Sequence, residues 1–224
     1  MKEPGEYYRV TRERLAGMLR EANDEDWRTP VPACPGWDVH AVVSHLVGVV
    51  EDAMAGRITG APPPEITAEQ VARHRSTPPE ELLATWAAIA PGFEEIITSI
   101  DSFAAALDVG AHEQDIRGAL GRPGARDSEL IRVGAERMVG MLDCGTPLAF
   151  DVGETAYLNA AAAAQGLDAG DDVLRARTTA FEVFRLRLGR RTRDQVRALE
   201  WSRDPGDLVD RLFIFGPAEH PVVE

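Results

Sequence analysis

The sequence has few cysteines, no excess of basic residues and no long apolar run. Its two cysteines, Cys34 and Cys144, are too few for a disulfide framework. No stretch of about 18 apolar residues occurs, so we expect no membrane span. Lysine and arginine number 24 against 37 acidic residues, giving a net charge of −13. This balance argues against a nucleic-acid partner, because phosphate binding requires a basic face.

The remaining composition is typical of a globular protein. Hydrophobic residues make up 44% of the 224-residue chain and charged residues 27%. A chain of this length can bury a substantial core, as one large domain or two small ones. The N-terminal residues lack an apolar signal region, so we expect a cytoplasmic protein. Basic charge is carried almost wholly by arginine, and alanine and glycine are abundant, which suggests a GC-rich genome such as that of an actinobacterium.

Helical periodicity dominates the first two thirds of the chain. Apolar spacing predicts a helix over 6–22, whereas three prolines and a glycine exclude regular helix over 28–37. Asp38 then has the position of an N-cap for a helix that runs to about residue 56. Further helices are predicted over residues 67–74, 77–99, 101–121 and 127–142.

Several of these helices carry recognisable start or stop signals. Thr67 and Asp101 are candidate N-caps, and Thr77 with Glu80 has the form of a capping box. Pro91, followed by glycine, predicts a kink or a break within 77–99.

The composition changes after about residue 146. Loose alternation and turn residues predict strands within 147–158, and 172–179 also has the pattern of a strand. A helix is predicted over 181–188, and Thr192 is placed to cap a last short helix. We therefore expect an α+β protein with a helical domain over 1–146 and a small α/β domain over 147–224.

Chemically informative residues gather in the helix predicted over 101–121. Asp108 and His112 are four residues apart, so on a helix they share one face. Both types of side chain bind divalent metals. The surrounding run is rich in alanine, leucine and isoleucine and indicates a helix that faces a core. A carboxylate and an imidazole buried there need a partner, either a metal ion, an arginine or a polar network.

His45 belongs to the helix that follows Asp38. It lies three residues after Val42 and so faces the apolar stripe, whereas His40 is about 140° away around the helix and should face outward. His45 is therefore either a core histidine with a hydrogen-bond partner or a ligand.

Three stretches together resemble a known family. They are TPVPACPGWDVHAVVSHLVG over residues 29–48, the pattern Asp-x3-His-x2-Asp-x-Arg-x2-Leu-Gly over 108–121, and the late segments 181–191 and 201–224. In this order they resemble the actinobacterial mycothiol-dependent maleylpyruvate isomerase family, within the wider group of DinB-like metal-binding helical bundles. The resemblance spans nearly the whole chain.

The resemblance implies a fold and a metal site. The fold is an N-terminal DinB-like four-helix bundle followed by a small C-terminal α/β domain similar to sterol-carrier folds. The implied metal is a divalent ion, usually Zn²⁺, with Ni²⁺ as a further candidate. The ligand positions that match are His45, Asp108 and His112. Better-studied members carry glutamate where this sequence has Asp108, which keeps the charge and the oxygen donor but is one methylene shorter.

The resemblance also implies a function, with alternatives left open. Mycothiol would be the thiol cosubstrate and a small electrophilic molecule the substrate, in an isomerisation or an S-transfer. A metal-free bundle that binds a small ligand, and a metal-dependent hydrolase that needs no thiol, are the alternatives. Neither a nucleic acid nor a membrane is expected as a partner, and the sequence does not give the oligomeric state.

The remaining candidates have supporting roles. Asp115, one turn after His112, is the candidate catalytic residue and could orient that imidazole through its other ring nitrogen. Arg117 is expected to pair with a carboxylate. Arg190 and Arg191 are candidates for binding an anionic group of the cofactor, the alternative being a solvated face. Cys34 is interpreted as a packed small residue, since no basic neighbour in sequence would activate its thiol.

Overall fold

The computed structural model describes residues 2–168, 170–222 and 224. By its internal contacts the chain divides into two compact units, the first extending to Gly124 and the second beginning at Ala125. The sequence places the boundary later, after residue 146. The difference is helix α7 (Glu129–Gly140), which packs against helix α9 and strand β2 of the second unit. No helix among the described residues is long and apolar enough to cross a membrane.

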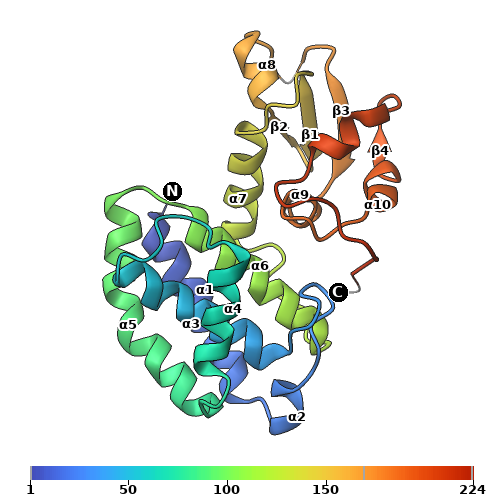
Figure 1. Ribbon diagram of the computed structural model, residues 1–224. Coiled ribbons are helices and arrows are strands. Elements are labelled where there is room, and N and C mark those ends of the chain that lie inside the picture. The colour runs from blue at the N-terminus through green and yellow to red at the C-terminus, as the bar shows by residue number, and fades with distance from the viewer. Residues whose placement is uncertain (1, 169, 223) are drawn as a thin grey trace. The chain divides into compact units, whose positions relative to one another are not determined.

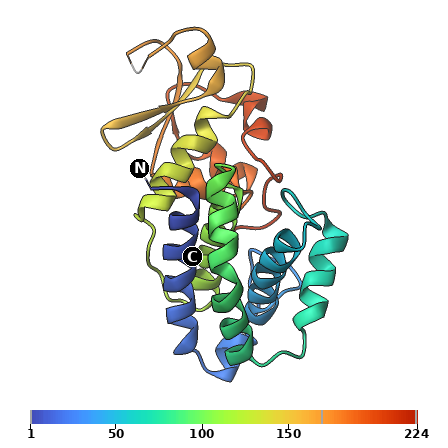
Figure 2. The same ribbon diagram turned by 90° about the vertical axis from the view of Figure 1, so that its left-hand side faces the viewer.

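The first unit is helical. Four long helices, α1 (Pro4–Arg20), α3 (Val39–Met54), α5 (Pro79–Ser99) and α6 (Ala104–Ala119), form a ring in which α1 and α3 each contact both α5 and α6 (Figure 1). The short helix α4 (Pro64–His74) packs against α3, and Figure 2 shows this pair beside the neighbouring α1 and α5. A one-turn helix, α2 (Asp24–Trp27), which the sequence analysis did not predict, precedes α3.

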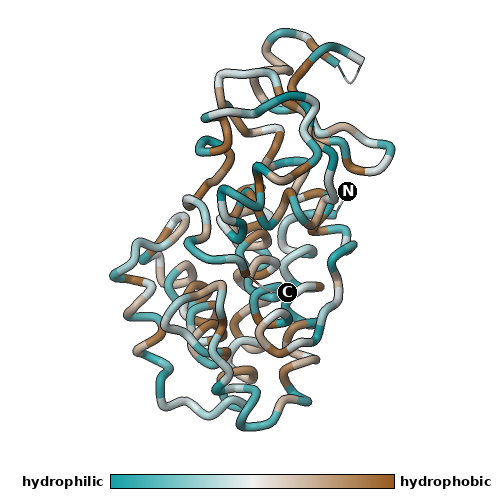
Figure 3. Tube along the Cα trace, turned by 90° about the vertical axis from the view of Figure 1, so that its right-hand side faces the viewer, coloured by the Kyte–Doolittle hydropathy of each residue, from teal (hydrophilic) through white to brown (hydrophobic). Residues whose placement is uncertain are grey.

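The ring encloses an apolar core. Hydrophobic and hydrophilic residues alternate along its helices (Figure 3), which puts one face of each toward the centre. Trp86 of α5 is buried and donates a hydrogen bond from its indole nitrogen to the Tyr8 hydroxyl of α1, 2.9 Å away. Burial of each large side chain contributes about 1.5–3 kcal/mol, so the core stabilises the ring on which the site is built. Other members of this core are Leu15, Leu19, Val43, Leu46, Val50, Leu82, Phe93, Val109 and Ile116.

Helix boundaries agree with the sequence best where a side chain caps the helix. Asp38 accepts a hydrogen bond from the Ala41 amide at 2.8 Å, which confirms the predicted start of α3. The capping box predicted at Thr77 is wrong, because α5 starts at Pro79 without a side-chain cap. Of the kink or break predicted at Pro91, the break does not occur, since α5 continues through this residue.

Two other predicted caps are also wrong. Helix α4 begins at Pro64, three residues before Thr67, and Pro63 precedes it without a side-chain cap. Asp101 lies in a turn with a φ of +48°, and α6 begins after Phe103. In both cases the chain turns earlier or later than the isolated capping residue indicates.

The second unit contains a four-stranded sheet in the order β2-β1-β3-β4, with bounds Leu148–Val152 (β1), Thr155–Leu158 (β2), Leu174–Thr178 (β3) and Glu200–Trp201 (β4). β1 pairs antiparallel with β2 and parallel with β3, and Phe150 of β1 stands opposite Tyr157 and Ala176. β4 pairs antiparallel with β3. The predicted strands within 147–158 and 172–179 are confirmed, and so is the α+β class.

Helices and a 3₁₀ turn complete the second unit. They are α7, α8 (Ala160–Ala164), α9 (Ala180–Arg187), α10 (Arg193–Arg197) and η1 (Gly206–Arg211). Thr192 caps α10, as the sequence predicts, and the structure shows that this cap is a complete capping box. α7 packs on α9, which makes α7 an integral part of this unit.

Candidate metal centre

Helix α3 carries His45 on its buried face. Val42 and Leu46 on the same stripe are 0% and 1% exposed, and His45 itself is 6% exposed. An imidazole in such surroundings requires polar partners, because leaving it unpaired costs several kcal/mol. The expectation that His45 faces the interior is confirmed, and His40 lies elsewhere, with its Nε2 atom 2.8 Å from the Thr77 carbonyl oxygen.

Helix α6 supplies the other polar residues. Asp108, His112 and Asp115 follow one another at helical spacing, and α6 contacts α3. His112 is 7% and Asp115 2% exposed, whereas 36% of the Asp108 side chain is exposed. The site therefore has a buried floor, with Asp108 as its most accessible member.

His45, Asp108 and His112 converge. The Nε2 atom of His45 lies 3.8 Å from one Asp108 oxygen, and the Nε2 atom of His112 lies 3.5 Å from the other. The two imidazole rings are 5.3 Å apart between centroids and nearly perpendicular. Ligand atoms within 4.8 Å of one another form a group that could hold a metal ion. Zinc bonds of about 2.0–2.1 Å in a tetrahedral site place neighbouring donors about 3.3 Å apart. The distances of 3.8 and 3.5 Å from the two Nε2 atoms to Asp108 would therefore need to shorten only slightly.

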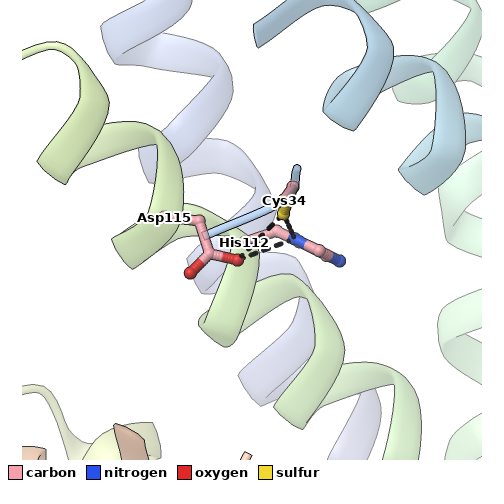
Figure 4. A group of neighbouring side chains, drawn as sticks. All are labelled: Cys34, His112 and Asp115. Atoms are coloured by element: carbon pink, nitrogen blue, oxygen red, sulfur yellow. Dashed lines mark hydrogen bonds and ion pairs between the residues drawn. The ribbon is translucent and has the colours of Figure 1, made fainter. Parts of the chain in front are cut away.

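The opposite nitrogen of His112 faces a second pair of groups. Its Nδ1 atom lies 3.0 Å from an Asp115 carboxylate oxygen and 3.7 Å from the Cys34 sulfur. Figure 4 shows this nitrogen directed toward Cys34 and Asp115 while the other ring nitrogen points away from them. Cys34 also donates a weak hydrogen bond to Asp115 at 3.5 Å. The predicted contact between Asp115 and His112 thus exists, and the catalytic role of Asp115 stays a prediction.

The pKa of His112 reflects this environment. Burial lowers it, but the negative charge of Asp108 and the hydrogen bond to Asp115 outweigh burial and raise the pKa to about 10. The two carboxylates beside His112 therefore favour a positive charge at this position. A bound metal ion would replace the proton on Nε2 and fulfil the same electrostatic role.

Cys34, His112 and Asp115 are a second group whose spacing could hold a metal ion. The two groups share His112 but use different ring nitrogens. In the second group, Asp115 already accepts hydrogen bonds from both His112 and Cys34, and its side chain is fully buried. These groups satisfy one another as hydrogen-bond partners, so we take the more open group around Asp108 as the better metal site.

The segment before α3 brings Cys34 to this position. The loop is closed by an antiparallel bridge between Pro30 and Asp38, and Gly36 turns the chain with a φ of +85° that favours glycine. The Trp37 ring lies 5.4 Å from the His45 ring, which places this side chain of the loop against α3. Cys34 has no basic neighbour in the sequence, whereas the fold places His112 beside its sulfur.

A cavity of about 1080 Å³ lies along the same loop. Trp27, Trp37, Arg28 and Arg75 are among its lining residues, which do not include the three candidate ligands. The cavity and the metal centre thus share Trp37 as a common wall.

Ion pairs lock α6 in place beside the site. Glu113, whose side chain is 1% exposed, accepts hydrogen bonds from Arg14 of α1 at 2.7 Å and from Arg117 at 3.0 Å. The predicted carboxylate partner of Arg117 is therefore Glu113. Since Glu113 directly follows His112, these bonds also fix the rotation of α6 about its axis.

Gln70 is a partner of the site that the sequence did not reveal. Its Oε1 atom lies 2.9 Å from Nδ1 of His45, and its amide nitrogen donates to Asp52 at 2.7 Å. A side-chain Cβ on residue 48 would lie 2.5 Å from Cβ of Gln70, so Gly48 allows α4 to approach α3 this closely. A glycine one turn after His45 is the only related signal in the sequence, and alone it does not identify Gln70.

Arg190 and Arg191 lie in the second unit. Arg191 is 7% exposed and pairs with Glu182 through bonds of 2.7 and 2.8 Å, so it is no solvated side chain. Arg190 donates to the Leu188 carbonyl at 2.7 Å. Their role toward a cofactor stays a prediction.

Comparisons with known proteins agree with one another. The family model described as mycothiol maleylpyruvate isomerase N-terminal domain matches residues 8–130. Crystal structures of the mycothiol-dependent maleylpyruvate isomerase and of a histidine-to-alanine mutant of it are similar to this chain, each with a TM-score of 0.52 and 13% identity, over 90% of this chain and 92% of that chain. At this identity the likeness concerns the fold. A search of the curated proteins gives no match.

Proposed function

The chain belongs, by its N-terminal domain, to the mycothiol maleylpyruvate isomerase family, and from this premise we propose that it is a metal-dependent enzyme that uses mycothiol. Its ligands are His45, Asp108 and His112, and zinc is the preferred ion, with nickel as the alternative, because imidazole suits both. The substrate is a small electrophilic molecule. The first unit is proposed to be a DinB-like bundle, and the second to be related to sterol-carrier folds.

One observation carries this proposal. The Nε2 atoms of two buried histidines point toward a single carboxylate, at 3.8 and 3.5 Å, while each Nδ1 atom has an acceptor of its own in Gln70 or Asp115. Metal-binding histidines use one ring nitrogen for the ion and donate the other N–H to such an acceptor.

The charge and exposure of the donors suit a thiol cosubstrate. Two neutral imidazoles and one carboxylate leave a divalent ion with a net positive charge, which favours an anionic further ligand. When bound, such an ion lowers the pKa of a coordinated thiol and so supplies a thiolate. Asp108 is the exposed donor, so cosubstrate and substrate would approach on its side of the site.

The residues of the chain have separate tasks in this scheme. His45 and His112 orient their Nε2 atoms, Asp108 balances charge, and Asp115 holds the Nδ1 proton of His112. The thiolate sulfur would add to an electrophilic carbon of a substrate double bond, which forms a C–S bond and moves the π electron pair onto the conjugated carbonyl group. Rotation about the former double bond and departure of the thiolate re-form the double bond and give an isomer, whereas protonation of the adduct at carbon gives an S-transfer.

The first experiment is a metal measurement on protein purified without chelator. We expect about one equivalent of zinc or nickel per chain in the wild type and its loss in His45→Ala. The matched control is His40→Ala, on the same helix, which should keep the metal. Protein without metal, whose melting temperature ignores added zinc, would instead favour a bundle that binds a small ligand.

The second experiment tests the thiol. Cobalt-substituted protein titrated with mycothiol should develop thiolate-to-metal absorption, and turnover of a maleylpyruvate-type electrophile should require the thiol. Turnover without any thiol would favour a metal-dependent hydrolase. Arg190→Ala and Arg191→Ala should raise the KM for mycothiol if these arginines bind the cofactor, and an unchanged KM would remove them from that role.

A further inference from the structure

The two candidate histidine ligands are held in different ways. His112 is supported by Asp115 from its own helix, three residues away. His45 is supported by Gln70, which comes from α4, and Gln70 in turn contacts Asp52 of α3. Both the His45–Gln70 and the Gln70–Asp52 hydrogen bonds are buried, and Gln70 is 0% exposed.

The hydrogen bonds that join His45, Gln70 and Asp52 allow one consistent assignment of donors and acceptors. Asp52 receives hydrogen bonds from Arg57 and from Arg73, so it is an ionised carboxylate that can only accept. The Gln70 group that faces Asp52 must then be its NH₂, which leaves the amide oxygen facing His45. An oxygen accepts only, so the His45 nitrogen opposite it carries a hydrogen.

We propose that Gln70 and Asp52 are positioning residues that hold His45 protonated at Nδ1, the tautomer that leaves the Nε2 lone pair for a metal ion beside Asp108. The importance of this tautomer for metal binding rests on the proposed function. The hydrogen on Nδ1 does not, because it follows from the hydrogen bonds that join Asp52, Gln70 and His45.

The backbone supports the same arrangement. Gly48 lies one turn after His45, at the point where α4 crosses close to α3. A methyl group there would lie 2.5–2.6 Å from the first two side-chain carbons of Gln70. The absence of a side chain at this position is therefore what allows Gln70 to reach His45.

The test uses two variants that break different links. In Asp52→Asn the new NH₂ group can donate to the Gln70 oxygen. The Gln70 amide can then rotate by about 180° and offer its NH₂ group to His45. Gln70→Leu removes the acceptor and keeps a side chain of similar size. The control is Glu51→Gln, because Glu51 shares Arg73 with Asp52 and also contacts His74, but lies outside the path to His45.

Two measurements distinguish a positioning role from a structural one. In metal-free protein, ¹⁵N–¹H spectra should show His45 protonated at Nδ1 in the wild type and in Glu51→Gln, and a mixture of tautomers in Asp52→Asn. Zinc affinity, measured by competition with a chelator, should fall about 10–100-fold in Asp52→Asn and in Gln70→Leu. The double variant should bind zinc no more weakly than Gln70→Leu, since Asp52 acts through Gln70.

The outcomes separate this inference from the proposed function. A wild-type protein that takes up neither zinc nor nickel would refute the metal-dependent function, while the tautomer spectra would still test the role of Gln70. Folded Asp52→Asn with a single His45 tautomer and wild-type zinc affinity would overturn the inference. An additional loss of affinity in the double variant would overturn it as well, because Asp52 would then act by its charge alone.

Discussion

Replacing Gly48 by alanine should separate metal affinity from stability. The added methyl group would lie 2.5 Å from Cβ, 2.6 Å from Cγ and 3.1 Å from Cα of Gln70. Ordinary contacts between carbon atoms are about 3.5–4.0 Å, so α4 must move away by about 1 Å. The hydrogen bond from His45 to Gln70, now 2.9 Å, would lengthen to about 3.9 Å and be lost.

The change in stability is the difference between two opposed terms. Alanine is favoured over glycine inside a helix by about 0.8–1.0 kcal/mol. Overpacking against α4 costs about 1–3 kcal/mol. We therefore expect the free energy of unfolding to fall by no more than about 2 kcal/mol, with a zinc affinity lower by about 10-fold or more.

The assay is zinc competition together with urea unfolding. Gly17→Ala is the matched control, because Gly17 lies inside α1 with nothing within 4 Å of the added methyl group. It should stabilise the protein by up to about 1 kcal/mol and leave zinc affinity unchanged. Gly48→Ala with wild-type zinc affinity would refute the argument that close approach of α4 serves His45.

Three further predictions concern neighbouring groups. Cys34→Ser should keep the full metal content. A loss of metal in this variant would indicate that the ion is held by the group of Cys34, His112 and Asp115 instead. Arg14→Met leaves buried Glu113 with fewer donors and should lower the free energy of unfolding in urea by about 1–3 kcal/mol, a loss below about 0.5 kcal/mol being the contrary result. Burial raises the pKa of Asp52, but hydrogen bonds from Gln70 and two arginines outweigh it and keep the pKa low. The stability difference between wild type and Asp52→Asn should therefore be full above about pH 4 and shrink as the pH falls further, and a difference constant down to pH 3 would contradict this.

Helix and strand positions could be predicted where the signal is local. The caps at Asp38 and Thr192 depend on hydrogen bonds within three residues, and both were predicted correctly. Thr67 and Asp101 look like caps in isolation, but the chain around them turns at Pro63 and after Phe103 instead. Pro91 is accommodated within α5, where the sequence alone favours a kink or a break.

The division of the chain was harder to predict than its elements. The change in composition near residue 146 marks where strands begin, and the predicted boundary lies there. Helix α7 ends before that point but packs against α9, some 40 residues later in the chain. The sequence of a helix does not specify which element covers its apolar face. The unit to which α7 belongs is therefore decided by contacts with residues distant in the sequence.

The two halves of the candidate site differ in the same respect. The contact between His112 and Asp115 follows from helical spacing, and the sequence predicted it. The contact between His45 and Gln70 joins residues that are 25 positions apart and lie on two different helices, and it depends on a glycine at position 48. Helical periodicity therefore identifies the α6 side of the centre, whereas the α3 side needs the packing of α4 to be known. For the same reason, a substitution in α4 should disturb metal binding through His45 while the bond between His112 and Asp115 persists.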